Sequence, residues 1–217
     1  MKLWLTTIVA IYSLALASDV LLAQSTQPTT QPAGSVAGAI KLPAGALTFE
    51  IVVYLSPGND QSIAAPAQPV KVAQKGAVFR PALVVVCIGQ TVEFVNDEDR
   101  PIDHNVFSNS PAMQFDLGLY KPGDSRSVTF NKPGPVLVYC SIHRNMDGAV
   151  YVSPTPYFCV VKPDGTAGDL KYQISGVPEG RWIVQTWQHQ RRFHEAQAVV
   201  VVEAGKCSRQ DLQLDSK

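Results

Sequence analysis

The chain has 217 residues, of which 46% are hydrophobic, so it can bury a substantial core and is longer than most single small sandwiches. Lysine plus arginine and aspartate plus glutamate each total 18, which gives a formal net charge of zero. This balance excludes long-range attraction to nucleic acid or to an anionic membrane surface. Partner choice must therefore depend on local features.

The N-terminus has the pattern of a secretory signal peptide. Lys2 precedes an apolar stretch at residues 3–17, and small residues then suit cleavage after Ala17 or Ala23. The alternative, a retained membrane anchor, needs roughly 20 continuous apolar residues. Three polar residues interrupt the run: Ser13, Ser18 and Asp19. We expect a Sec-type signal peptide at 1–23, a periplasmic or secreted bacterial location, and no transmembrane segment in the mature chain.

The next segment, residues 24–34 (QSTQPTTQPAG), is expected to form a flexible tether because it cannot bury apolar surface. Short runs rich in β-branched and aromatic residues then alternate with Pro and Gly turns. They lie at residues 35–42, 49–55, 70–72, 83–86, 91–95 and 127–130. No convincing helix pattern is present, so the sequence predicts an all-β chain built on an antiparallel sandwich.

The segment SPTP at 153–156 is a candidate domain boundary. Further strands are expected beyond it, at 157–161, 172–174, 182–187 and 198–202. We expect one domain at 35–155, including an N-terminal strand extension, and a second, smaller β-sandwich module at 156–217. A core of about 60 residues is marginal by itself. The module is therefore expected to lean on its neighbour or to borrow the strands near Val36 and Ile51.

Three potential metal ligands recur at every third residue in VYCSIHRNM, residues 138–146. Cys140 ends an apolar run, and His143 and Met146 follow in a short loop before the next strand. A thiolate, two imidazoles and a weak thioether are the donors of a trigonal copper(II) site with a long axial bond. His104 is the candidate for the second imidazole, because it and His143 are the two histidines between the tether and Pro156.

These motifs resemble those of the cupredoxins, the type 1 blue copper proteins such as plastocyanin, amicyanin and pseudoazurin. The resemblance covers roughly residues 79–152 and rests on FRP, GQTVEF, ND, HNVF, GLYKPG and YCSIHRNM, with the short Cys-x-x-His-x-x-Met loop of the amicyanin type. It implies a Greek-key β-sandwich with one type 1 copper per chain, bound by His104, Cys140, His143 and Met146. It also implies a bond between Asn105 and Ser141 that ties the two ligand-bearing segments together.

The tail, with PDG at 163–165 and GVPEG at 176–180, resembles carboxypeptidase regulatory-like or transthyretin-like sandwiches. The whole arrangement resembles exported bacterial cupredoxin-domain proteins, some described as methylamine-utilisation-like. Related ligand loops usually carry a proline beside the second histidine, whereas Ile142 and Arg144 flank His143 here. The resulting charged edge changes the surface offered to a redox partner.

The expected function is that of an exported one-electron carrier, not an enzyme, whose redox partner docks near His143. Zinc is the alternative metal, but it rarely recruits methionine and prefers four stronger donors. Copper delivery or storage, or a structural role in an envelope assembly, are the alternative functions. A multicopper oxidase or nitrite-reductase-like enzyme is disfavoured because the sequence has no His-x-His pair.

Export would place the cysteines in an oxidising compartment, where pairing is allowed. Cys159 and Cys207 lie near opposite ends of the tail module, and a disulfide between them is expected. The alternative is pairing with Cys87, which otherwise packs as a free core thiol.

Two further features of the tail have open interpretations. His189 and His194 are a candidate second metal or partner-binding patch, although the arginines between them favour a solvated loop. Trp182 and Trp187 lie five positions apart on one expected strand and so face opposite sides. One is expected in the core and the other at the surface.

Overall fold

The structure is a computed structural model that describes residues 33–43, 50–58, 63–162, 169–190 and 192–217. The expected signal peptide and nearly all of the tether lie outside the described residues. Residues Gln31–Lys217 form one compact unit. No helix in the described part of the chain is long and apolar enough to cross a membrane.

Every regular element of the described residues is a β-strand, so the prediction of an all-β chain is confirmed. The strands in chain order are β1 (Ala33–Lys41), β2 (Ile51–Pro57), β3 (Val70–Gln74), β4 (Phe79–Arg80), β5 (Leu83–Cys87), β6 (Thr91–Asn96), β7 (Phe107–Ser110), β8 (Met113–Asp116), β9 (Ser125–Thr129), β10 (Gly134–Tyr139), β11 (Asp147–Ser153), β12 (Phe158–Val161), β13 (Leu170–Pro178), β14 (Gly180–Gln188), β15 (Gln197–Val202), β16 (Cys207–Arg209) and β17 (Leu212–Gln213).

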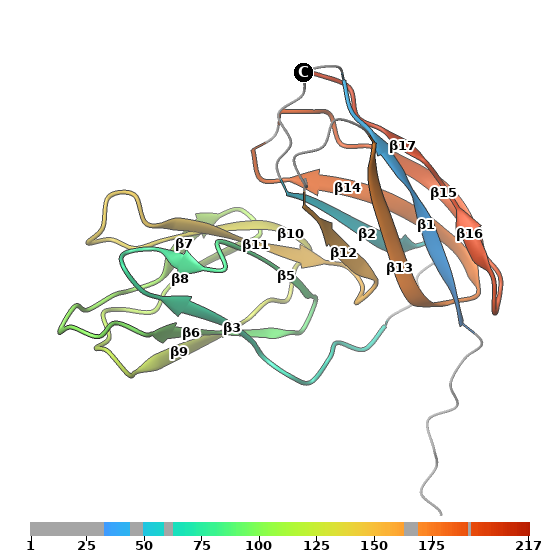
Figure 1. Cartoon of the computed structure of the whole chain (residues 1–217). Helices are drawn as coiled ribbons and strands as arrows, with labels where there is room; N and C mark the ends of the chain where they lie inside the picture. The colour runs from blue at the N-terminus through green and yellow to red at the C-terminus, as the bar shows by residue number, and fades with distance from the viewer. Residues whose placement is uncertain (1–32, 44–49, 59–62, 163–168, 191) are drawn as a thin grey trace, which may run out of the picture. The chain divides into compact units, whose positions relative to one another are not determined.

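The first sandwich consists of the sheets β5-β11-β10-β7-β8 and β4-β3-β6-β9 (Figure 1). Alternating residues of both sheets, such as Val92 and Phe94 on β6 and Val136 and Val138 on β10, fill one shared core. The expected sandwich was antiparallel, but β3 pairs with β6 and β5 pairs with β11 in parallel. Connections that cross between the two sheets allow such pairs, because consecutive strands need not be neighbours in one sheet.

The second sandwich consists of β13-β1-β16, with β17 also paired to β1, and β12-β2-β14-β15. Both N-terminal strands lie inside these sheets: Val36 of β1 pairs with Ile174, and Val52 of β2 pairs with Val160. The strands expected as an extension of the domain at 35–155 therefore pair with the tail. The short tail provides the strands on both sides of β1 and β2, and the two N-terminal strands complete a core that the tail alone would leave open.

One strand, β11, contributes to two cores. Val150 and Val152 point into the core of the first sandwich, whereas Ala149 and Tyr151 pack with residues of β2 and β14 in a separate cluster. In that cluster the Tyr151 ring stacks on Trp187, with ring centroids 4.7 Å apart and an interplanar angle of 26°. The outer face of β11 is thus covered by the second sandwich.

This cluster explains why one expectation about the tryptophans is wrong. Trp182 and Trp187 do face opposite sides of β14, but they are only 1% and 3% exposed. Trp182 lies in the core of the second sandwich. Trp187 is covered by the first sandwich, a contact that the strand period alone cannot reveal.

The expected disulfide between Cys159 and Cys207 is not formed, because all four cysteines, each of which lies within the described residues, are free. Cys159 is half-buried on β12, and burial raises the pKa of its thiol to about 11. Cys207 is exposed on β16 beside Ser35 of β1. The two residues lie on different sheets of the second sandwich, since β12 pairs with β2 and β16 pairs with β1. Cys87 is a buried free thiol, as expected for the unpaired case.

Candidate metal centre

The potential ligands come from two segments at one end of the first sandwich. His104 lies between β6 and β7, where its backbone pairs with Tyr120 in both directions: His104 N donates to Tyr120 O at 3.1 Å and Tyr120 N donates to His104 O at 2.8 Å. Cys140 directly follows β10, and His143 lies in the loop between β10 and β11. The strand pairing of Tyr139 with Asp147 closes this loop. Two backbone bonds tighten it, from Cys140 N to Met146 O and from Met146 N to His143 O.

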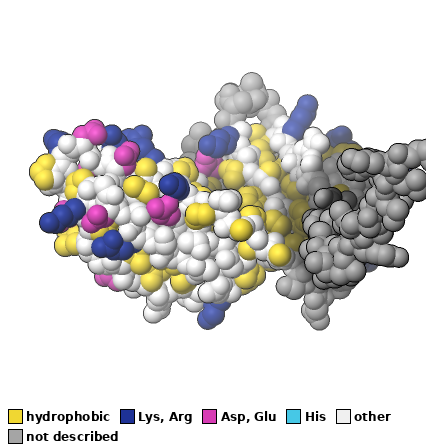
Figure 2. Space-filling view, turned by 90° about the horizontal axis from the view of Figure 1, so that it is seen from below, with side chains coloured by type: hydrophobic (Ala, Val, Ile, Leu, Met, Phe, Trp, Pro, Cys, Tyr) yellow, Lys and Arg dark blue, Asp and Glu magenta, His cyan; other side chains and the backbone are white. Residues whose placement is uncertain are grey.

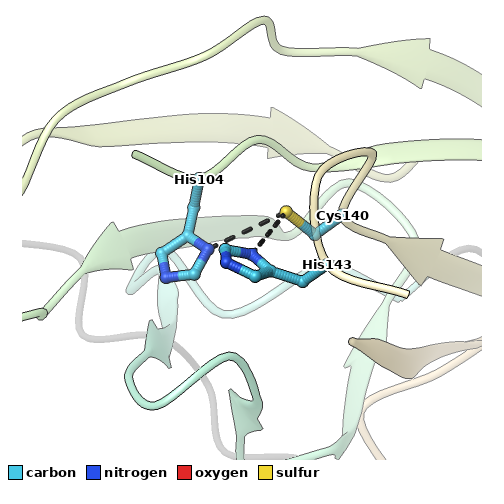
Figure 3. Close-up of side chains that lie close together, drawn as sticks. All are labelled: His104, Cys140 and His143. Atoms are coloured by element: carbon cyan, nitrogen blue, oxygen red, sulfur yellow. Dashed lines mark hydrogen bonds between the residues drawn. The ribbon is translucent and has the colours of Figure 1, made fainter. Parts of the chain in front are cut away.

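The side chains of His104, Cys140 and His143 point toward one another (Figure 3). The Cys140 Sγ lies 3.8 Å from Nδ1 of His104 and 3.5 Å from Nδ1 of His143. Metal bonds of about 2.0–2.3 Å, at angles of about 109–120°, would separate a nitrogen and a sulfur ligand by about 3.5–3.8 Å. The observed separations therefore fit a single ion held between the three atoms. This is the one group of at least three His, Cys, Asp or Glu ligands with such spacing in the part of the chain that the structure describes.

The burial of the four candidates is uneven. His104 is 0%, Met146 2% and Cys140 6% exposed, whereas His143 is half-buried. Met146 and Cys140 belong to the same apolar core cluster. A centre bound here would be closed on the core side and reached from solvent through the His143 side.

A carboxylate that the sequence did not single out holds the other nitrogen of His104. Glu98 Oε1 lies 3.0 Å from His104 Nε2, and both side chains are buried. The backbone N–H groups of Gly76 and Ala77 donate to the same oxygen at 2.6 and 3.3 Å. The hydrogen bond with His104 lowers the pKa of the Glu98 carboxyl, and the two backbone donors act in the same direction. The ionised carboxylate accepts a hydrogen bond from Nε2–H, which leaves Nδ1 free to bind a metal.

We expect Glu98→Gln to weaken metal binding by about 10- to 100-fold, because the neutral amide no longer raises the basicity of the imidazole or selects its tautomer. Competition with a chelator of known affinity measures the effect. Asp99→Asn is the matched control, since Asp99 lies in the same loop and its exposed carboxylate pairs with Lys75 at 2.9 Å instead of with His104. Equal affinities of the two variants would contradict this role of Glu98.

Asn105 and Ser141 form the contact that the resemblance implies. Asn105 Oδ1 accepts hydrogen bonds from Ser141 N at 2.7 Å and from Ser141 Oγ at 3.0 Å. Asn105 Nδ2 donates to Asp116 Oδ1 at 3.2 Å, a partner that no sequence motif indicated. The segment with His104 is thereby joined to the segment with Cys140.

His189 and His194 do not form a second centre with a third ligand-type residue among the described residues. His194 is exposed, as expected for a solvated loop. His189 is half-buried, with its ring centroid 6.2 Å from that of Trp187. Together with Glu50 and Asp147 it lines a cavity of about 200 Å³.

The fold and the site define an all-β protein with a His-Cys-His cluster at one end of a sandwich. Residues 67–153 match the model of a family described as copper binding proteins, plastocyanin/azurin family. This segment of the chain is therefore a copper-binding cupredoxin domain, and copper is the metal that its family binds. The match begins after β2 and ends with β11, so it covers the first sandwich and not the second.

Solved structures show similarity over part of the chain. A purple cupredoxin from Nitrosopumilus maritimus is 24% identical, with 39% of this chain and 99% of that chain covered and a TM-score of 0.36. Amicyanin from Paracoccus versutus is 22% identical over 46% of this chain and 98% of its own, with a TM-score of 0.36. A copper-containing nitrite reductase from Thermus scotoductus SA-01 is 28% identical over 45% of this chain but only 25% of its own, with a TM-score of 0.38.

Proposed function

We propose that the chain is a type 1 copper protein that transfers single electrons through one mononuclear site. His104, Cys140, His143 and Met146 would hold the copper, with the Met146 thioether as the weakest of the four donors. The observation that carries the proposal is the approach of both Nδ1 atoms to one thiol, at 3.8 and 3.5 Å, within a domain of a copper-binding family. Bound copper would supply a one-electron couple, because imidazole suits Cu(II) and soft sulfur suits Cu(I).

The protein's own contribution is to keep the ligands in place during the change of oxidation state. Glu98 restrains the buried imidazole, and Asn105 restrains the start of the cysteine loop through Ser141. These bonds support electron transfer because groups that are already positioned need little rearrangement. The carrier itself catalyses no reaction in this proposal.

Electrons would pass at the exposed edge of the site. His143 is the solvent-side ligand, and its neighbours Ile142 and Arg144 are exposed. Ile142 is 51% and Tyr139 is 36% exposed, so apolar surface accompanies the arginine near the ligand loop. We propose that a redox partner protein docks here. On the face drawn in Figure 2, acidic and basic side chains are interspersed, which favours local contacts over attraction to a polyanion.

The test is to purify the chain without its first 23 residues, add Cu(II), and record the visible and electron paramagnetic resonance spectra. An intense thiolate-to-copper absorption with the small hyperfine splitting of a type 1 site, bleached reversibly by a mild reductant, is expected. A protein that stays colourless with copper but binds zinc tightly would overturn the proposal. A copper-delivery protein would instead lose its Cu(I) readily to a chelator.

We also propose that the chain is exported, on the basis of the signal-like residues 1–23. Fractionation of bacteria that express the full chain, with N-terminal sequencing of the product, tests this. Recovery of an uncleaved chain in the cytoplasm would contradict it.

A further inference from the structure

Gln74 is a fully buried polar residue whose side chain bonds to residues next to the candidate centre. It ends β3 and is 0% exposed. Its backbone is held by the neighbouring strand, since it pairs with Asn96 of β6 and its carbonyl accepts a bond from Asp97 N at 2.9 Å. Burying a side-chain amide is costly unless its polar atoms are hydrogen-bonded. The partners of the Gln74 amide therefore indicate what its burial achieves.

Both ends of the amide have a buried partner near His104. The hydroxyl of Tyr120 donates to Gln74 Oε1, and Gln74 Nε2 donates to the backbone carbonyl of Asn105 at 3.2 Å. A tyrosine hydroxyl carries its proton at neutral pH and can donate to Oε1, whereas the backbone carbonyl of Asn105 can only accept. Because the donor hydroxyl faces Oε1, the NH₂ group must face Asn105. The orientation of the amide is thus determined by its surroundings.

The two partners of Gln74 lie in the two segments that hold His104. Tyr120 pairs with the His104 backbone in both directions, and Asn105 follows His104 in the chain. Asn105 also accepts the two bonds from Ser141, the residue after Cys140. The Gln74 amide therefore links β3 to the segments that hold the His104 imidazole. Through Asn105 and Ser141 it is also linked to the segment that holds the Cys140 thiol.

We propose that Gln74 is a positioning residue for the copper centre: by bonding Tyr120 and Asn105 at once, it fixes the His104 segment against β3 and so keeps the imidazole in place for the metal. This inference rests on the proposed function. Gln74 does not touch the metal in this arrangement, and it acts through the backbone on either side of the ligand.

The test is Gln74→Met, which keeps the length of the side chain and removes both hydrogen bonds. We expect the Cu(II) affinity to fall by about 10- to 100-fold, the size of effect seen for groups that orient a metal ligand. We also expect a changed copper hyperfine splitting, because the His104 ring is no longer held in one position. Chelator competition and electron paramagnetic resonance on the purified, copper-loaded chain measure the two effects.

Gln90→Met is the matched control. Gln90 is a second buried glutamine of the same sandwich, 7% exposed, and its amide also both accepts and donates: Oε1 accepts from Cys87 N at 3.1 Å and Nε2 donates to Gln68 O at 3.1 Å. Its partners include no candidate ligand. Both variants should lose similar thermal stability without metal, but the Gln90 variant should keep the wild-type affinity and hyperfine splitting.

The outcomes separate this inference from the proposed function. If the wild-type chain forms no type 1 site, the proposed function fails. If it does and Gln74→Met binds copper with the affinity and spectrum of Gln90→Met, the positioning role is overturned and the copper centre stands. Should Gln74→Met not fold, Tyr120→Phe removes only the bond to Oε1. An expected loss of about two- to tenfold in affinity would then support the role, and an unchanged affinity and spectrum would overturn it.

Discussion

Replacement of Cys140 by serine is expected to abolish the thiolate-to-copper absorption entirely. The thiol is the atom that both imidazoles approach, and it is the soft donor that makes the site acceptable to Cu(I). A serine hydroxyl stays protonated at neutral pH and is a hard donor, so Cu(I) affinity should fall by more than about 100-fold, beyond the 10- to 100-fold effect of outer groups. Titration with copper under reducing conditions, followed by visible spectroscopy after oxidation, measures both quantities.

Cys87→Ser is the control for the loss of a buried thiol. Cys87 lies on β5 in the same sandwich, is 2% exposed, and has Gln90 as a polar neighbour. Its replacement should reduce stability and leave the colour unchanged. A Cys140→Ser variant that keeps the intense absorption would show that the thiol is not a ligand.

Trp187→Ala is expected to reduce the free energy of unfolding by about 3–5 kcal/mol, as for other large aromatic residues removed from a core. The Trp187 ring stacks on Tyr151, and Tyr151 in turn lies 5.1 Å from Tyr54 between ring centroids. These three aromatic residues make up much of the cluster that covers the outer face of β11. Without Trp187, the two sandwiches should unfold in separate transitions, which copper absorbance and tryptophan fluorescence can follow during denaturant titration.

Trp182→Ala is the matched control, because Trp182 lies on the same strand and faces the core of the second sandwich. A comparable loss is expected, but it should weaken the second sandwich and leave the midpoint followed by copper absorbance unchanged. A loss below about 1 kcal/mol for Trp187→Ala would contradict the importance of this cluster.

The loop Cys140–Met146 shows why part of the site could be predicted. Its candidate ligands are separated by two residues each, and the apolar runs on both sides predict two strands that bring the loop together. The first imidazole lies 36 positions before the cysteine, and it could be assigned because His104 and His143 are the two histidines of that region. The spacing within the loop and the small number of histidines were therefore enough to assign, from the sequence, the residues that approach one another.

The groups that hold these ligands could not be assigned in the same way. Glu98 lies in the run NDEDR, where its neighbours Asp97 and Asp99 have the same chemistry, and only the folded loop directs Glu98 to His104. Gln74 lies 31 positions before Asn105, at the end of β3, and no sequence motif links the two residues. Which of several similar side chains reaches a ligand depends on the direction in which each side chain points. The order of residues does not specify that direction.

The sequence by itself determined the strand-rich fold and the chemical nature of the centre, because both follow from neighbours in the chain: alternating apolar residues, turn residues, and ligands in one short loop. Only the tertiary structure decided that β1 and β2 complete the second sandwich, that Trp187 is buried, and that Cys159 and Cys207 stay apart. The physical reason is that each of these depends on which distant strands pair and which sheet faces meet. A strand pattern specifies that one face is buried but not the surface that buries it.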